Sequence, residues 1–321
     1  MSPPEFWARP GLLPSLLQPV ARAYAALGAA RRHAVTPYRA PVPVICVGNL
    51  VVGGAGKTPV VESVVQILRR RGHRPGILSR GYGGAAAGPL RVAPARHDAA
   101  AVGDEPLLLA RAAPVWVGRD RAAAARAACA AGADCLVMDD GFQNPGLAKD
   151  LSLLVIDGSY GLGNGRVMPA GPLREPAPQG LARADAIVLI GDDRAGIAAR
   201  VVKPMLRAAL APTNGAAFAG RAVVAFAGIG RPAKFFASLR AAEARLVAQH
   251  VFPDHHSYRE SELRRLASEA AANDAALVTT EKDHVRLGEE WRERIATLAV
   301  RIVWEDESRV TALLDTVLRH G

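Results

Sequence analysis

The sequence predicts an α/β fold: a mostly parallel sheet with helices on both faces, followed by a second, smaller α/β domain. Short apolar runs alternate with amphipathic helical patterns from residue 42 to residue 190, as in repeated strand–helix–strand units. After Lys203 the alternation is interrupted and then resumes, which indicates a second unit. A chain of 321 residues that is 50% hydrophobic is long enough to bury two cores.

The first domain is expected over residues 34–204. Its first strand, 42–47, is a continuous apolar run, which is typical of buried parallel strands. The next segment, 58–71, has apolar residues at helical spacing, and Gly72 provides a stop for that helix. Further strands are expected at 75–78, 115–117, 135–138, 153–156 and 186–190, with helices at 105–112 and 119–131.

Residues 205–221 are expected to form a linker or a hairpin, because Pro212, Asn214, Gly215 and Gly220 gather there. The smaller domain is then expected over residues 222–321. Its strands are predicted at 223–227, 276–279 and 302–304.

Residues 1–33 have the pattern of an amphipathic helix. Its apolar positions are Leu13, Leu16, Leu17, Val20, Tyr24 and Leu27. Nearby arginines and the aromatic pair Phe6 and Trp7 suit a helix that lies on an anionic membrane. The alternative is an ordinary amphipathic helix packed on its own domain. A cleaved signal peptide fits less well, because Pro14 and Pro19 interrupt the apolar region.

The formal net charge is +10. The abundance of arginine and alanine beside rare lysine indicates codon bias, which accounts for part of this excess. The remainder suggests an anionic partner such as a nucleotide, a nucleic acid or a phospholipid surface. The sequence has no run of 18 apolar residues, so no membrane-spanning helix is expected.

The stretch "VGNLVVGGAGKTPV" at residues 47–60 lies between the first strand and the first helix. In that position a glycine-rich turn can direct backbone N–H groups and the helix N-terminus at phosphate oxygens. Val51 replaces one expected glycine, and the adjacent Gly53 and Gly54 can supply the turn instead. The predicted nucleotide-binding residues are Gly53, Gly54, Ala55, Gly56, Lys57, Thr58 and Pro59, with Lys57 on the β- and γ-phosphates and Thr58 on Mg²⁺.

A nucleotide site of this kind also needs a carboxylate near the metal. Asp139 and Asp140 follow the apolar run "CLVM" and would lie at the carboxyl end of a strand, where α/β sheets bind ligands. Asp157 also ends an apolar run, but the glycine after it favours a turn-forming role.

Several segments, taken together and in order, resemble the tetraacyldisaccharide 4′-kinase family of the lipid A pathway. They are the phosphate loop followed by "SRGYGG", "VGDEPLLLA", "VGRDR", "MDDGFQ", "GNGRVMPAGPLREP", "AFAGIGRP", "FPDHHSY" and "TTEKD". The resemblance covers residues 42–283. It implies a phosphate-loop kinase-like larger domain, and Mg-ATP as the phosphoryl donor to the 4′-hydroxyl of the lipid A disaccharide precursor, a tetraacyldisaccharide 1-phosphate. It also implies peripheral attachment to the cytoplasmic face of the bacterial inner membrane through the N-terminal region.

The resemblance assigns Asp104 as the catalytic base, assisted by His255. A carboxylate hydrogen-bonded to an imidazole can accept the proton of an attacking sugar hydroxyl. On the residues alone, Asp104 would be the N-cap of a helix and His255 a loop histidine. The resemblance also makes Asp139 and Asp140 the carboxylates at the metal and nucleotide. Lower-weight substrate contacts are expected at Arg80, Arg119, Arg121, Gln143, Arg174 and Glu175.

The sequence does not assign a role to three residues near these motifs. Asn144 occupies a place where many family members have histidine, so its contribution to the site is not assigned. Glu281 and Lys282 fit either nucleotide contacts or a structural ion pair.

Two other classes of function remain to be weighed. A nucleotide-hydrolysing switch or metallochaperone would use the same loop, but it would not need the "GDEP", "LREP" and "DHH" motifs. A nucleic-acid-binding protein is not favoured, because aromatic residues make up 5% of the chain and no nucleic-acid motif occurs. No nucleic-acid partner is therefore expected.

Overall fold

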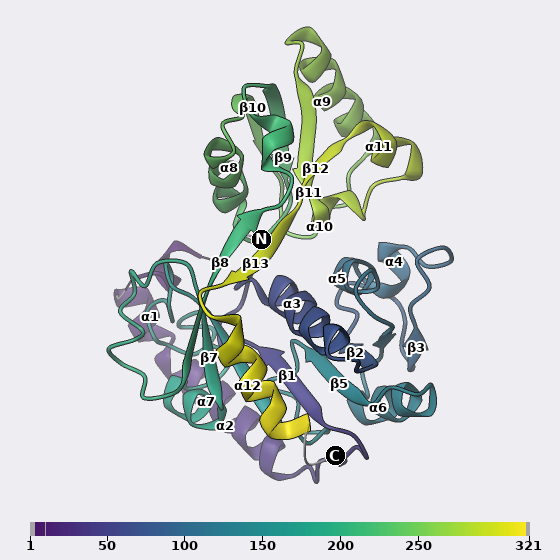
Figure 1. Ribbon diagram of the computed structural model, residues 1–321. Coiled ribbons are helices and arrows are strands. Elements are labelled where there is room, and N and C mark those ends of the chain that lie inside the picture. Colours follow the sequence, from purple (N-terminus) through teal and green to yellow (C-terminus); the bar gives the residue numbers. More distant parts are fainter. Residues whose placement is uncertain (1–3, 10, 319–321) are drawn as a thin grey trace.

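The computed structural model describes residues 4–9 and 11–318 and contains two sheets within them (Figure 1). The larger sheet has the strand order β13-β8-β7-β6-β1-β5-β2-β4-β3. Its inner pairs from β8 to β4 are parallel, and only the outer pairs β13–β8 and β3–β4 are antiparallel in the part of the chain described. Its strands are β1 Val44–Gly48, β2 Pro75–Ser79, β3 Leu90–Arg91, β4 Val115–Val117, β5 Cys135–Asp139, β6 Leu151–Asp157, β7 Ala186–Ile190, β8 Met205–Pro212 and β13 Val300–Trp304. The α/β prediction is thereby confirmed.

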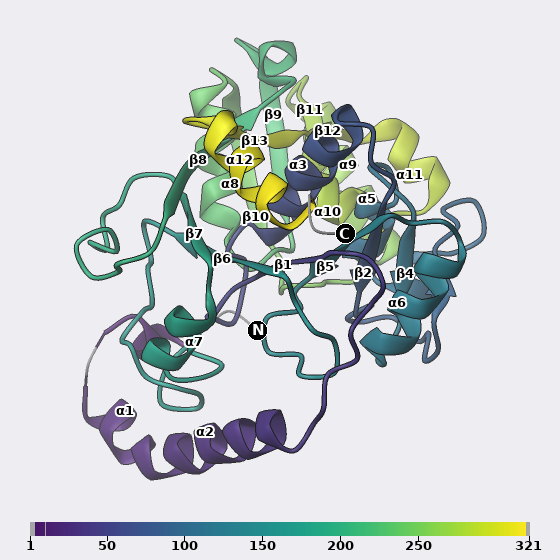
Figure 2. The same cartoon turned by 60° about the horizontal axis from the view of Figure 1, so that its bottom comes forward.

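Helices cover both faces of this sheet because its central strands are apolar on both sides. Every residue of β1, β5, β6 and β7 is buried. Figure 2 shows α3 and α12 side by side on one face, with α7 across the sheet from them. The pair is joined by Arg71 and Asp315 at 2.7 Å. The helices around this sheet are α3 Lys57–Arg70, α4 Ala99–Val102, α5 Asp104–Leu109, α6 Arg121–Ala130, α7 Ala177–Arg183 and α12 Glu307–Leu318.

The smaller sheet has the order β10-β9-β11-β12, with all of its pairs parallel. Because side chains alternate along a strand, β9 faces two cores. Val223 and Ala225 pack with α8, whereas Val224 and Phe226 pack with α9 and α11. The elements are β9 Ala222–Ala227, α8 Pro232–Ala241, β10 Arg245–Val251, α9 Glu260–Ala272, β11 Ala276–Thr280, α10 Glu281–His284, α11 Glu289–Arg294 and β12 Ala296–Leu298.

The predicted linker at 205–221 is wrong in its first half, because β8 is a strand of the larger sheet. The short 3₁₀ helix Gly215–Phe218 follows β8. The predicted smaller domain also extends too far. β13 returns to pair antiparallel with β8, and α12 packs on the larger sheet. Figure 1 shows β8 and β13 running side by side between the two domains. Val300 pairs with Pro212, a contact between distant segments that no local pattern reveals.

The N-terminal segment forms the 3₁₀ helix Glu5–Trp7 and the helices α1 Leu12–Leu16 and α2 Gln18–His33. Figure 2 shows α1 and α2 along the edge of the molecule, on the side away from the smaller domain. Leu12, Leu16 and Leu27 are 86%, 75% and 72% exposed, whereas Ala21 is buried and Leu17 packs on the larger core. The helices therefore rest on the protein through one face and leave these three leucines uncovered. Among the described residues, the structure contains no helix with the length and apolar character needed to span a bilayer.

Candidate active site

The predicted phosphate loop lies between the end of β1 at Gly48 and the start of α3 at Lys57. Gly53 and Gly56 have φ angles of +105° and +83°, which L-residues with side chains rarely adopt. A Cβ added at Gly56 would also lie 2.7 Å from Cδ1 of Ile190. Val51, the departure from the usual loop pattern, is buried and forms an isolated bridge with Leu173, so it anchors the loop. The loop therefore presents backbone N–H groups and a helix N-terminus, as a phosphate site requires.

Asp140 connects the loop to the "LREP" segment. Its Oδ1 lies 3.7 Å from Nζ of Lys57, and Arg174 Nη1 donates to both carboxylate oxygens at 2.8 and 2.9 Å. Burial acts to raise the pKa of Asp140, but Lys57 and Arg174 hold that pKa below its ordinary value. The Asp140 backbone has a φ of +52°, which is uncommon outside glycine and often marks functional sites.

Glu175, beside Arg174, is 1% exposed and is held from three directions. Gln143 Nε2 donates to its Oε1 at 3.0 Å and to the backbone oxygen of Asn49 at 2.9 Å. Arg183 donates to the Glu175 carboxylate at 2.8 Å, and Arg32 of α2 lies 3.6 Å from it. The structure thus brings the predicted residues Gln143, Arg174 and Glu175 together with Asp140, and links them to the N-terminal helix.

Asp139 is the residue best suited to hold a cation. It is 1% exposed, and one of its oxygens accepts from Ser79 Oγ at 3.3 Å. Its other oxygen, Oδ1, is buried without a hydrogen-bond partner among the described residues. Burial, reinforced by the charges of Glu105 and Asp140, raises the pKa of Asp139. A buried, unpaired carboxylate oxygen on which the charge of Lys57 acts fits Mg²⁺, which prefers oxygen ligands.

Asp104, buried at 4% exposure, lies at the start of α5 and receives groups from the smaller domain. His255 Nδ1 lies 3.1 Å from Asp104 Oδ2, and the Arg286 guanidinium donates through Nε to the same oxygen at 2.8 Å. Lys282 lies 4.0 Å from that oxygen and 3.5 Å from His255 Nε2. Although burial acts to raise it, the hydrogen bond with His255 and the charges of Lys282 and Arg286 hold the pKa of Asp104 well below its usual range. Asp104 is therefore an ionised carboxylate at neutral pH.

The two halves of the site meet at the phosphate loop. A Cβ added at Gly230 would lie 3.3 Å from the Gly54 nitrogen and 3.4 Å from Oδ2 of Asp254, the residue before His255. His255 itself has a φ of +59° and donates its backbone N–H to Gly228 at 3.1 Å. The catalytic pair suggested by the resemblance is thus built from both domains and lies on the loop side of their interface.

The remaining predicted residues have different surroundings. Arg121 is 4% exposed and donates to the Gly118 backbone oxygen, in a position where its charge acts on Asp139 and Asp140. Arg80 and Arg119 are exposed, just beyond the ends of β2 and β4. Asn144 accepts from the Gly146 N–H at 2.9 Å and so stabilises a turn.

Glu281 and Lys282 separate into two roles. Glu281 pairs with Arg301 of β13 at 2.7 Å, which is a structural ion pair. Lys282 pairs with Glu105 at 3.2 Å and lies beside His255, so it belongs to the site.

Sequence reasoning missed two groups at the domain interface. Arg286 binds Asp104, and Arg231 and Lys234 bind Asp157, which had been assigned to a turn. The only available signal was that "AFAGIGRP" contributed an arginine to the family resemblance.

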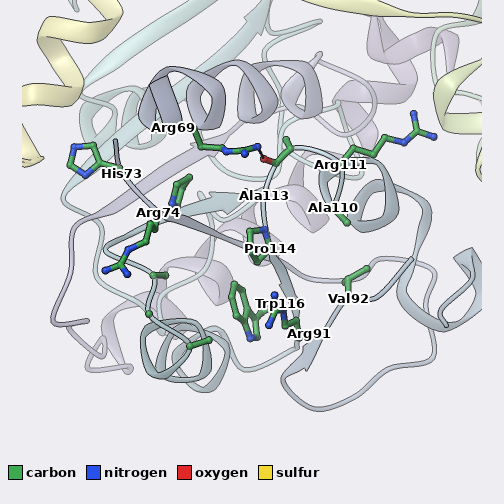
Figure 3. Close-up of a pocket in the computed structure, with 15 residues that line it drawn as sticks. Arg69, His73, Arg74, Arg91, Val92, Ala110, Arg111, Ala113, Pro114 and Trp116 are labelled. Atoms are coloured by element: carbon green, nitrogen blue, oxygen red, sulfur yellow. Dashed lines mark hydrogen bonds between the residues drawn. The ribbon is translucent and has the colours of Figure 1, made fainter. Parts of the chain in front are cut away.

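A cavity of about 540 Å³ lies elsewhere, at the C-terminal end of α3 and the first residues of β2 and β4 (Figure 3). None of the predicted site residues lines it. Its lining includes Arg69, His73, Arg74, Arg91, Arg111 and Trp116.

Comparison with known proteins identifies the family. The sequence profile described as tetraacyldisaccharide-1-P 4′-kinase (LpxK) matches residues 13–319. The tetraacyldisaccharide 4′-kinase of Rhodospirillum centenum is 58% identical, covering 99% of this chain and 97% of that protein. The enzyme of the same name from Paramagnetospirillum magneticum is 53% identical, covering 99% of each. The crystal structure of "apo" form LpxK from Aquifex aeolicus in complex with ATP superimposes with a TM-score of 0.76 at 28% identity, covering 96% of this chain and 100% of that one. The chain therefore belongs to the tetraacyldisaccharide 4′-kinase family of phosphotransferases.

Proposed function

We propose that this protein transfers the γ-phosphoryl group of ATP to the 4′-hydroxyl of a tetraacylated glucosamine disaccharide 1-phosphate. The observation that carries the proposal is the Asp104–His255 pair, held at 3.1 Å across the domain interface beside a phosphate loop. A switch protein needs the loop but has no use for a proton acceptor at an acceptor-hydroxyl site. The names of the relatives support the same substrate.

In the proposed reaction, the loop 53–58 and Lys57 bind the ATP phosphates, while Asp139, Asp140 and Thr58 hold Mg²⁺. Bound Mg²⁺ would neutralise charge on the phosphate oxygens. The substrate oxygen forms a bond to the γ-phosphorus as the bond to the β-phosphate oxygen breaks, releasing ADP. The hydroxyl proton passes to the Asp104–His255 pair. Because Asp104 is ionised and already accepts hydrogen bonds from three residues, it orients His255 and stabilises the positive charge that the imidazole gains.

Arg174, Gln143 and Glu175 are proposed to contact the sugar or its 1-phosphate. They share one hydrogen-bonded network with Asp140, so a substrate group bound there would lie close to the metal carboxylates. Arginine suits this role because its forked donors match phosphate oxygens.

The transfer reaction tests the proposal. Purified protein with Mg²⁺ and γ-labelled ATP is expected to move the label to the tetraacyldisaccharide 1-phosphate, with no transfer to the same lipid already phosphorylated at the 4′ position. ATP hydrolysis at an unchanged rate with and without the lipid, and no label in the lipid, would remove the kinase function and leave a nucleotide-hydrolysing switch.

We further propose that α1 and α2 rest on the cytoplasmic face of the inner membrane as a peripheral anchor. The exposed leucines at 12, 16 and 27 are available for insertion, and burial of each apolar side chain contributes on the order of 1–2 kcal/mol. Arg22 and Arg31, both exposed, supply charge complementary to anionic lipids.

Replacing Leu12, Leu16 and Leu27 by serine is expected to lower binding to vesicles of anionic phospholipid by at least 10-fold in a sedimentation assay, without loss of folding. Val202→Ser is the matched control, because Val202 is an exposed apolar residue of the larger domain, 99% exposed. Equal binding of the triple variant and the control would refute the anchor.

A further inference from the structure

Asp157 is a buried carboxylate that joins the two domains. It ends β6 and is 2% exposed. Its Oδ1 accepts from Ser159, from the backbone N–H at 3.0 Å and from the hydroxyl at 2.7 Å. Its Oδ2 accepts from two cations of the smaller domain, Arg231 and Lys234, at the start of α8. Residues so far apart in the sequence converge here only because the domains are closed on each other.

This cluster flanks the phosphate loop. Asp157 pairs in register with Ile190 of β7, and Cδ1 of Ile190 lies 2.7 Å from a Cβ added at Gly56. Gly230, the residue before Arg231, also approaches the loop: a Cβ added at Gly230 would lie 3.3 Å from the Gly54 nitrogen. The backbone just before Arg231 thus lies against the loop at Gly54, and the carboxylate that Arg231 binds ends the strand paired with Ile190, which contacts Gly56.

The cluster has more positive charge than its carboxylate neutralises. Two cations share one carboxylate, which leaves one positive charge in excess. Although burial acts to raise it, hydrogen bonds from Lys234 and Ser159 and the charge of Arg231 hold the pKa of Asp157 below its ordinary value. Arg231 also stacks on Tyr160 at 4.4 Å, and the Lys234 side chain is 44% exposed. A guanidinium fixed by an aromatic ring and a carboxylate is preorganised to accept a further anion.

A second cluster across the same interface has a different composition. Arg286, which binds Asp104, is shared with a second carboxylate, Asp283, at 2.8 Å. Arg286 therefore already joins the two domains, and Asp104 and Asp283 compensate its charge. The Asp157 cluster, by contrast, retains one excess positive charge. The surplus favours an anionic ligand over a purely structural bridge.

We propose that Arg231 and Lys234 bind the phosphate chain of the nucleotide, and that Asp157 is the positioning residue that holds them beside the loop. The smaller domain then supplies positive charge to the transferring phosphates as well as the histidine of the proton-accepting pair. This inference rests on the proposed binding of ATP to the loop 53–58 and goes beyond it by naming phosphate ligands outside the loop.

Calorimetric titration of the full chain with ATP and with adenosine, without acceptor lipid, tests the inference. Arg231→Ala and Lys234→Met are each expected to raise the Kd for ATP by about 10-fold or more, because each removes a charge-assisted hydrogen bond. The Kd for adenosine is expected to stay within about twofold, since adenosine has no phosphate. Arg240→Ala, in the last turn of the same helix, is the control and should change neither value.

Asp157→Asn separates positioning from bridging. It leaves both cations in place but no longer held by a carboxylate, so the ATP affinity is expected to fall less than in Arg231→Ala. In the double variant that combines Asp157→Asn with Arg231→Ala, the increase in the Kd for ATP is expected to be smaller than the product of the two single increases. Equal loss of ATP and adenosine affinity in Arg231→Ala would show that the cluster only holds the domains together. An unchanged ATP affinity in both cation variants would also overturn the inference. If Arg231→Ala has a clearly lower melting temperature than the unmodified protein, Lys234→Met is the decisive variant, because the Lys234 side chain is half-exposed.

These outcomes are independent of phosphoryl transfer. Failure to label the lipid would refute the proposed function while leaving the nucleotide affinities interpretable. Normal transfer in Lys234→Met, with an unchanged Kd for ATP, would leave the kinase function standing and remove the phosphate contact.

Discussion

Asp104→Asn is expected to lower kcat for phosphoryl transfer by about 10²- to 10⁴-fold, the usual contribution of general acid–base catalysis, because the proton-accepting pair loses its carboxylate. In the unmodified protein the Glu105 N–H donates to Asp104 at 2.9 Å. The asparagine amide can still accept this hydrogen bond, but without a negative charge it cannot stabilise a protonated His255. The nucleotide phosphates are bound by a different set of groups, so the Kd for ATP is expected to change by less than about threefold. Single-turnover transfer and calorimetric ATP binding measure the two quantities separately.

The burial of Asp104 makes a stability control necessary. Arg286 is 7% exposed, and it loses one of its two carboxylate partners in Asp104→Asn while keeping Asp283. A loss of about 1–3 kcal/mol in the free energy of unfolding is therefore expected, and activity should be measured well below the melting temperature.

Arg286→Met is the matched variant. It removes the same ion pair but leaves the carboxylate beside His255, so kcat is expected to fall by less than about 10-fold. If Arg286→Met and Asp104→Asn lose kcat equally while both remain folded, Asp104 acts by closing the domains and not in proton transfer. His255→Gln combined with Asp104→Asn should lose little more than either alone, because residues that act as one unit are not additive.

The parts of the fold that follow from local patterns could be predicted. The buried apolar runs gave strands within three residues of the observed ends, and the predicted strand at 186–190 coincides with β7. The phosphate loop was recognisable because glycines, a lysine and a helix start occur in consecutive order. The assignment of β8 to a linker failed because Asn214 and Gly215 suggest a turn, whereas what makes β8 a strand is its pairing with β7 and with β13, whose residues lie about 90 positions later.

The residues of the site were likewise predictable only where a local pattern marks them. Asp104 and His255 are 151 residues apart, and only the family resemblance suggested their contact. Arg286 and Arg231 were missed because a lone arginine in a loop or a short helix has the pattern of a solvated surface residue. Their significance comes from the burial of their carboxylate partners, Asp104 at 4% and Asp157 at 2% exposure. Burial across a domain interface is a tertiary property, so the sequence could name the loop but not the cations that surround it.

Lys57→Met is expected to lower kcat/KM for ATP by about 10²- to 10³-fold, the magnitude seen when one preorganised charge-stabilising donor is removed. Methionine retains much of the length and the apolar stem of lysine, so the start of α3 should keep its packing. Asp140, which now lies 3.7 Å from the Lys57 ammonium, retains Arg174 at 2.8 Å. The carboxylate is therefore not left unpaired, and the melting temperature is expected to change little.

The substitution also tests whether Val51 has disabled the loop. Lys203→Met is the control, because Lys203 lies outside the site and donates to the backbone oxygen of Ala182 at 3.2 Å. A fall in kcat/KM in Lys57→Met, with Lys203→Met unchanged, would establish that the loop binds the reacting phosphate despite the missing glycine. Equal activity of the two variants would mean that the nucleotide phosphates bind elsewhere. The positive φ of Gly53 favours the first result, since it turns the loop without the glycine that Val51 replaces.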